Sequence, residues 1–173
     1  MVNASIRVAV ALGSNLGDRR GHLEFGVTQL AALLTDLRVS TIRETAPVDV
    51  SGPQPPYLNA VAAGACDVDP QELLQRLLAI ENARGRNRPS LRAPRTLDLD
   101  LILYGDRVID RPGLTVPHPR FRERGFVLEP LAEIAPEWED PITGKTVVLL
   151  RDELAQRNDE RPSGPNGECF SDP

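Results

Sequence analysis

Residues 92–106 read RAPRTLDLDLILYGD, and they carry the clearest structural pattern of the chain. Leucine fills every second position of its middle: Leu97, Leu99, Leu101 and Leu103. This period of two predicts a β-strand over residues 96–104 that buries one face. Asp98 and Asp100 lie between the leucines, so they share the opposite face, roughly 6.5–7 Å apart along the strand. Neighbouring carboxylates repel each other, and the pair therefore needs a cation or open solvent.

Around this strand the chain alternates between strand-like and helix-like patterns. Strands are expected at 6–12, 37–45, 57–67 and 96–104, and helices at 19–34 and 70–84. A capping box formed by Asp69 and Glu72 starts the second helix. The order β-α-β-β-α-β predicts a ferredoxin-like α+β fold, an antiparallel sheet with helices packed on its face. Two helices on one face would leave the other face free for a site, where the loops at 46–56 and 85–95 could meet.

After residue 104 the pattern becomes shorter and more irregular. Residues 104–110 predict a turn into a short antiparallel partner for the preceding strand. Helices are expected at 124–134 and 146–156. From residue 158 the chain is polar and rich in Gly and Pro, which is typical of disorder. We therefore expect one domain over residues 1–157 and a disordered tail over 158–173.

Composition excludes several classes of protein. The 173 residues suit one domain, and a net charge of −5 argues against binding to nucleic acid or acidic membranes. No apolar run approaches the length of a membrane span. Cys66, Cys169, His22 and His118 are the only cysteines and histidines, too few and too scattered for a disulfide scaffold or a zinc cluster. Such cysteine usage fits a reducing compartment, so we expect a cytoplasmic protein, and a monomer.

The aspartate pair suits a magnesium site. Mg²⁺ prefers carboxylate oxygens and takes its remaining ligands from water and substrate phosphates, and two such ions can clamp a phosphoryl-transfer centre. Five arginines precede the pair and can bind phosphate oxygens: Arg84, Arg86, Arg88, Arg92 and Arg95. The plain alternatives are a solvated edge strand and a merely soluble basic loop.

Other candidate residues are weaker when taken alone. Tyr57 and Asn59 share a strand face, where Asn can pair with the edge of a heterocycle and Tyr can pack on its ring. Glu81 continues the apolar stripe of its helix, so its carboxylate needs an arginine or a metal-bound water as a partner. The alternative is a frayed helix end that exposes it to solvent. His118 stands between two prolines, where an ordinary turn histidine is the alternative. A second basic cluster surrounds this turn: Arg120, Arg122 and Arg124.

Several segments together resemble the 6-hydroxymethyl-7,8-dihydropterin pyrophosphokinase family. They are APRTLDLDLILYGD (93–106), ALGSNLGD (11–18), ETAPV (44–48), YLNAV (57–61), IENARGR (80–86) and LTVPHPRFRERGFVLEPLAEIAP (114–136). PRTLDLD with VPH downstream is the most specific part. The resemblance implies a ferredoxin-like fold and transfer of pyrophosphate from ATP to the hydroxymethyl oxygen of the pterin in folate biosynthesis, with release of AMP. Both substrates are small molecules.

The resemblance also implies roles for individual residues. Asp98 and Asp100 would hold two Mg²⁺ ions that bridge the ATP phosphates and the attacking hydroxyl. The ATP contacts would be Arg86, Arg88, Arg95, Leu101, Thr115, His118 and Arg124, of which Arg86 and Arg95 would also be catalytic. The pterin pocket would be Thr45, Val48, Tyr57, Asn59 and Phe126, with Tyr57 and Phe126 sandwiching the ring. Glu81 matches an acidic supporting residue.

The sequence departs from the family pattern in places, most clearly at Arg92, and two other functions compete. Arg92 stands where many members have Trp, and we expect it to help close the basic loop over ATP. Another two-metal enzyme on this fold, such as a nucleotidyltransferase, would usually spread its carboxylates over two strands. An RNA-binding module would expose aromatic residues on the central strands, and the strands at 6–12 and 96–104 do not present them.

Overall fold

The computed structural model describes residues 5–47, 53–85 and 95–160. Its elements are β1 (Ile6–Ser14), α1 (Arg19–Ala31), β2 (Thr35–Val39), β3 (Arg43–Thr45), β4 (Tyr57–Cys66), α2 (Pro70–Ala83), β5 (Asp98–Tyr104), β6 (Ile109–Arg111), β7 (Leu114–Val116), the 3₁₀ turn η1 (Phe121–Glu123), α3 (Gly125–Ile134) and α4 (Val147–Asp159). No helix among these described residues is long and apolar enough to cross a membrane.

The strands form an antiparallel sheet with the order β2-β4-β1-β5. The short strand β3 also pairs with β4, so it extends the sheet next to Tyr57 and Asn59. β1 lies in the middle and pairs with β4 on one side and β5 on the other. This arrangement confirms the ferredoxin-like prediction.

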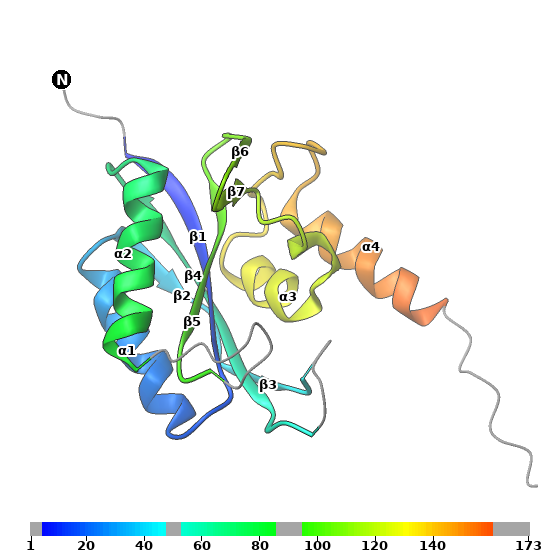
Figure 1. Ribbon diagram of the computed structural model, residues 1–173. Helices are drawn as coiled ribbons and strands as arrows, with labels where there is room; N and C mark the ends of the chain where they lie inside the picture. Colours follow the sequence, from blue (N-terminus) through cyan, green and yellow to red (C-terminus); the bar gives the residue numbers. More distant parts are fainter. Residues whose placement is uncertain (1–4, 48–52, 86–94, 161–173) are drawn as a thin grey trace, which may run out of the picture.

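Helices cover both faces of the sheet (Figure 1). α1 and α2 lie on one face, and α3 lies on the other with α4 beyond it. The prediction that the second face is free is therefore wrong. The second face is covered because β4 is apolar on both sides: Ala60, Val61, Ala62 and Ala63 are all buried. Both faces of the strand must therefore pack against other elements.

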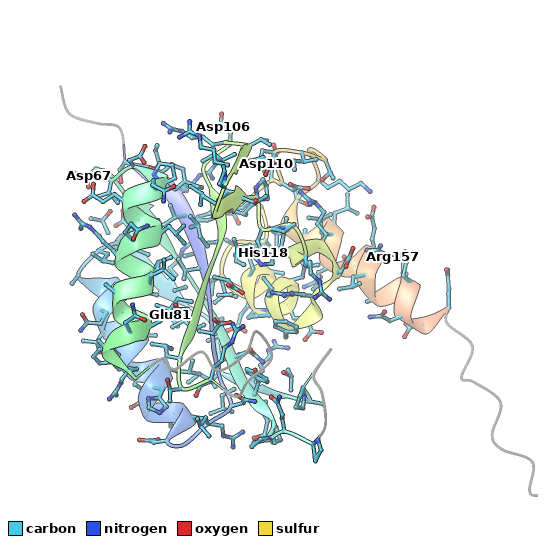
Figure 2. The ribbon with its side chains drawn as sticks, viewed as in Figure 1. Asp67, Glu81, Asp106, Asp110, His118 and Arg157 are labelled. Carbon is cyan, nitrogen blue, oxygen red and sulfur yellow. The ribbon has the colours of Figure 1, made fainter. Side chains whose placement is uncertain are left out.

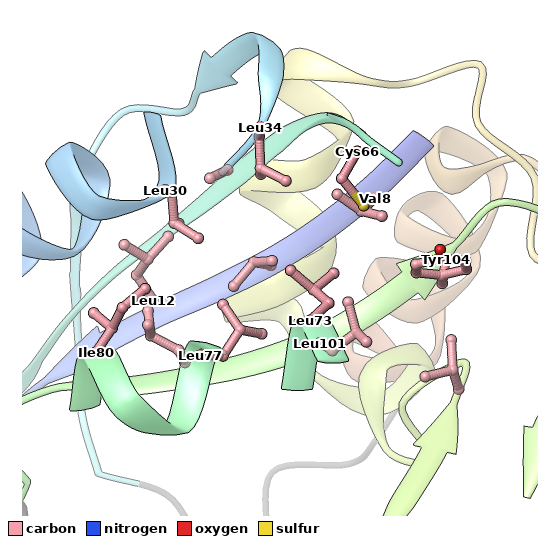
Figure 3. Packing of buried hydrophobic residues seen from close by; sticks show 14 of the residues in the cluster. Val8, Leu12, Leu30, Leu34, Cys66, Leu73, Leu77, Ile80, Leu101 and Tyr104 are labelled. Atoms are coloured by element: carbon pink, nitrogen blue, oxygen red, sulfur yellow. The ribbon is translucent and has the colours of Figure 1, made fainter. Parts of the chain in front are cut away.

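Two hydrophobic cores result, one on each side of the sheet. In the first core, Leu73 and Leu77 of α2 pack with Leu12 of β1 and Leu101 of β5 (Figure 3). The second core packs α3 and α4 against the sheet through Val61, Ile102, Phe121, Leu128, Leu131 and Leu150. The site residues lie on the α3 side, beyond the end of this second core.

Several expected boundaries differ in the structure. The strand expected at 37–45 is two strands, because buried Ser40 interrupts it: its N–H donates to Val61 O at 2.9 Å and its Oγ accepts from Val61 N at 3.0 Å. The partner expected for residues 96–104 pairs instead with β7, since Gly113, with φ of 81°, allows a tight hairpin. Helix α1 ends at Ala31, and α4 runs to Asp159.

Candidate active site

Asp98 and Asp100 lie on the α3 face of β5, as the alternation predicts. Leu97, Leu99 and Leu101 point into the first core on the other face. Leu103 departs from the pattern and packs in the second core, because the pairing with β1 shifts register between Ala9 and Val10. The shift comes after the aspartates, so their shared face is kept.

Cationic side chains surround the two carboxylates. Arg95 Nη1 lies 2.5 Å from Asp98 Oδ1, and Arg124 Nη1 lies 3.4 Å from Asp100 Oδ2. Burial lowers the pKa of Arg95, but the neighbouring Asp98 outweighs it and the pKa is raised overall. The aspartates thus lie next to guanidinium groups that can also bind phosphate.

The donor set fits a hard cation that brings ligands of its own. Asp98 and Asp100 offer carboxylate oxygens, with side chains 19% and 35% exposed. No group of three or more His, Cys, Asp or Glu side chains is arranged for a metal ion among the described residues. Mg²⁺ suits such a site, because it is often held by one or two carboxylates and fills its sphere with water and phosphate oxygens.

His118 faces Asp100 as a neutral ring. Its Nδ1 accepts a hydrogen bond from Arg120 N at 3.1 Å, so the ring hydrogen belongs on Nε2, which lies 3.9 Å from Asp100 Oδ2. Burial, and then the charge of Arg124, lower the pKa of His118 to about 4. At neutral pH the ring is a hydrogen-bond donor without charge.

The second basic cluster is divided between the site and the core. Arg124 faces Asp100, but Arg122 forms two hydrogen bonds of 2.7 and 2.6 Å to Asp140, which is fully buried. Arg122 is therefore a structural residue, and the prediction of one three-arginine cluster is wrong. Arginines at every second position of an irregular turn look alike in sequence but point in different directions.

The expected pterin residues gather beside the aspartates. Tyr57 and Asn59 lie on the same face of β4 as Val61 and Ala63, which is the α3 face. Asn59 Nδ2 donates to Thr45 Oγ1 at 2.6 Å. Burial raises the pKa of Tyr57, and the nearby charges that act on it are Arg95 and Asp98. The start of β4 and the start of β5 thus lie close together.

Phe126 enters this site from the first turn of α3. It is half-buried, and the guanidinium of Arg124 lies over its ring at 5.5 Å from the centroid. Arg124 thus contacts both sides of the site, because it pairs with Asp100 and packs on Phe126.

Glu81 sits on the α2 side of β5, and His118 on the α3 side (Figure 2). Glu81 is 1% exposed, and its Oε1 accepts the N–H of Leu99 at 2.7 Å. A frayed helix end is therefore ruled out. The carboxylate instead binds the strand backbone between the two aspartates.

Two expected ATP contacts lie along β5 and β7. The Leu101 side chain is buried in the first core, so only its backbone could meet a ligand. Thr115 on β7 is exposed, and its Oγ1 lies 3.4 Å from Asp110 Oδ1. Other predicted residues lie outside the described ranges, as does most of the predicted tail: Val48, Arg86, Arg88, Arg92 and residues 161–173.

Asn15 is the site residue that sequence reasoning missed. It is fully buried, and its Oδ1 accepts the N–H of Arg95 at 2.8 Å while its Nδ2 donates to Gln54 Oε1 at 3.1 Å. Its own N–H donates to Arg95 O at 3.1 Å. Asn15 thereby joins the segments that enter β4 and β5. The sequence pointed to Asn15 only through the GSNLG turn, and Asn is common in turns for local reasons, so the turn alone did not indicate a site residue.

Comparison with known proteins identifies the relatives of the chain. The family model described as 7,8-dihydro-6-hydroxymethylpterin-pyrophosphokinase (HPPK) matches residues 9–136. The 2-amino-4-hydroxy-6-hydroxymethyldihydropteridine pyrophosphokinase of Synechocystis sp. is 44% identical over 146 residues, covering 84% of this chain and 74% of that protein. The Bacillus subtilis protein of the same name is 43% identical over 136 residues, covering 78% of this chain and 81% of its own length.

Solved structures support the fold. Wild-type Plasmodium falciparum HPPK-DHPS with STZ-DHP superposes with a TM-score of 0.72 at 15% identity, over 91% of this chain. The chain spans only 45% of that longer protein. At this identity the likeness concerns the fold alone.

Proposed function

The chain belongs to the 7,8-dihydro-6-hydroxymethylpterin-pyrophosphokinase family, and from this premise we propose how its site works. The enzyme transfers pyrophosphate from ATP to the hydroxymethyl group of 6-hydroxymethyl-7,8-dihydropterin, a step of folate synthesis, and AMP is the other product. The oxygen of the hydroxymethyl group bonds to the β-phosphorus, and the bond from that phosphorus to the oxygen shared with the α-phosphate breaks. The hydroxyl proton is released to solvent, and AMP leaves with the shared oxygen.

Asp98 and Asp100 are the residues that would hold Mg²⁺. We propose two ions, because two carboxylates and a triphosphate offer enough oxygen ligands for both. Bound Mg²⁺ supplies charge stabilisation on the transferred phosphates. The aspartates contribute fixed positions, since their strand is held by β1 on one side and by Glu81 on the other.

Arg95, Arg124 and His118 form the phosphate side of the site. The arginines hold permanent charge close to the aspartates, so they can stabilise negative charge that develops on the leaving AMP and on the transferred group. His118 donates through Nε2–H without adding a charge. Arg86 and Arg88 complete this set in our proposal.

Thr45, Tyr57, Asn59 and Phe126 form the pterin side, with Val48 as a further proposed wall. Within the described residues, the bond to Thr45 leaves the Asn59 amide a second hydrogen and its oxygen for a ligand, which suits the donor and acceptor edge of a pterin. Tyr57 and Phe126 supply aromatic faces from two different elements. The acceptor is thereby oriented with its hydroxymethyl group toward Asp98.

One observation carries the proposal: the aspartate pair and the Tyr57–Asn59 pair lie on the same face of the sheet, on strands separated only by β1. The direct test mixes purified protein with ATP, Mg²⁺ and the dihydropterin and separates the nucleotides by chromatography. AMP formed only when both substrates are present supports the proposal. ADP formation, or AMP formation without the pterin, would contradict it.

The rival functions find less support. A nucleotidyltransferase would usually spread its carboxylates over two strands, whereas Asp98 and Asp100 both lie on β5. An RNA-binding sheet needs an open face. Here helix α3 packs on the sheet face that carries the site and covers the part of that face next to the site. We further propose a monomer that works in the cytoplasm, which light scattering of the purified chain and cell fractionation can test.

A further inference from the structure

Gly13 lies in the row of residues that joins the two halves of the site. In β1 it is paired with Asn59 of β4 and with Asp98 of β5. Neighbouring strands lie about 4.8 Å apart, so the backbones of Asn59 and Asp98 are separated by roughly 10 Å with Gly13 between them. A ligand that reaches from Asn59 to Asp98 must therefore pass over Gly13.

The missing side chain of Gly13 provides room for the Asn59 amide. A Cβ at Gly13 would lie 3.2 Å from Asn59 Oδ1 and 3.7 Å from Tyr57 Cδ1. The first distance is tighter than an ordinary contact, so an alanine methyl would displace the amide by a few tenths of an ångström. Asn59 cannot easily retreat, because its Nδ2 is held by Thr45 Oγ1 at 2.6 Å.

Backbone conformation does not explain the glycine. Gly13 is in the extended strand and is not among the glycines with positive φ, so alanine is sterically allowed there by the backbone. Glycine within a strand is less favourable for stability than alanine. Glycine therefore costs a little stability at this position, and the group that gains most room from the missing Cβ is the Asn59 amide.

We propose that Gly13 is a positioning residue of the pterin pocket. Its lack of a side chain lets the Asn59 amide lie over the central strand toward Asp98, where it sets the position of the acceptor's hydroxymethyl group. The inference rests on the proposed function, because it needs the pterin to bind at Asn59.

The test is Gly13→Ala, with pterin and ATP kinetics measured separately. The KM for the pterin should rise, or kcat fall, by about tenfold, since small misplacements of a reacting group are costly. Binding of a non-hydrolysable ATP analogue should stay within about twofold of wild type, and the melting temperature should be equal or higher. Unchanged pterin kinetics, a matching loss of ATP binding or a lower melting temperature would each overturn the proposal.

A double-mutant cycle shows whether Gly13 acts through Asn59. In the Asn59→Ala background the crowded amide is gone, so Gly13→Ala should have little further effect. Additive effects of the two substitutions would contradict the proposed route.

A matched control makes the same change in the first core. At Gly26 a Cβ would lie 3.1 Å from Leu12 Cδ2, a similar crowding away from the pterin side. Gly26→Ala should change stability but not the KM for the pterin, and a raised KM there would mean that general strain explains both variants. Wild-type protein that releases no AMP would refute the proposed function, whereas an active wild type with an equally active Gly13→Ala variant would refute only this inference.

Discussion

The backbone N–H of Leu99 donates a hydrogen bond of 2.7 Å to Oε1 of Glu81. Leu99 lies between Asp98 and Asp100, on the strand that forms the edge of the main sheet in the described residues. Its N–H would otherwise be a buried donor on the unpaired side of the strand. A helix carboxylate therefore fixes the segment of strand that presents both aspartates.

Substitutions of Glu81 can separate this hydrogen bond from the charge. Glu81→Ala should lower the free energy of unfolding by roughly 1–3 kcal/mol, because it leaves the Leu99 N–H unsatisfied. It should also raise the Mg²⁺ concentration needed for half-maximal activity. Glu81→Gln keeps an acceptor oxygen and should preserve most of both properties. Urea unfolding and Mg²⁺ titrations of activity provide the measurements. If Glu81→Gln lowers stability and raises the Mg²⁺ requirement as much as Glu81→Ala does, the negative charge matters and not the acceptor oxygen.

The aspartates themselves should be indispensable for turnover. Asp98→Asn and Asp100→Asn should each lower kcat by at least about 10²–10³, the usual effect of removing one charge-stabilising group from a polar active site. Each change keeps the shape of the side chain, so the circular dichroism spectrum should be that of wild type. Asp106→Asn is the control, since Asp106 is exposed in the turn after β5, away from His118 (Figure 2). Near-normal turnover in either site variant would eliminate the metal assignment.

The ion pair between Arg122 and Asp140 should stabilise the turn that carries His118 and Arg124. Burial raises the pKa of Asp140, but hydrogen bonds from Arg122, Thr143 and Ile142 outweigh it and hold the pKa below its ordinary value. A depressed pKa contributes stability that is present above the unfolded value of about 3.9 and is lost as the pH falls through the folded value.

Asp140→Asn should therefore cost about 2–3 kcal/mol of unfolding free energy at pH 7. The difference from wild type should begin to narrow as the pH falls below about 3.9, because the carboxyl group of the unfolded wild-type chain is then protonated, and it should narrow further as the pH falls through the lower pKa of the folded protein. Urea unfolding of both proteins at pH 7 and pH 3 measures this directly. A difference that stays constant across that range would mean that the charge of Asp140 contributes little.

Features that depend on a local sequence pattern could be predicted, whereas features that depend on contacts between distant residues could not. The leucine alternation of β5 identified the face of Asp98 and Asp100, because strand periodicity is a property of the segment itself. Arg122 pairs with Asp140, which lies 18 residues further along the chain, beyond helix α3. No local pattern marks this pairing, so the sequence could not distinguish Arg122 from Arg124, which faces the site. The role of Asn15 depends on Arg95, 80 residues away.

The contacts of Asn15 lead to the last prediction, which concerns how the two halves of the site are held together. Asn15→Ala removes the acceptor for Arg95 N–H and the donor to Gln54 in one step. It should therefore weaken both ATP and pterin binding, by roughly 1–3 kcal/mol in total, because the partly buried backbone N–H of Arg95 loses the acceptor Asn15 Oδ1. Gln54→Ala removes the acceptor for Asn15 Nδ2 in the segment before Tyr57 but keeps the hydrogen bond between Asn15 and Arg95 N–H. It should therefore raise the KM for the pterin and leave binding of an ATP analogue nearly unchanged. Calorimetry with the analogue and steady-state kinetics with the pterin distinguish the two variants. If Gln54→Ala weakens ATP binding as much as Asn15→Ala does, the two hydrogen bonds of Asn15 do not have separate effects. The proposal that Asn15 links the two segments would then be wrong.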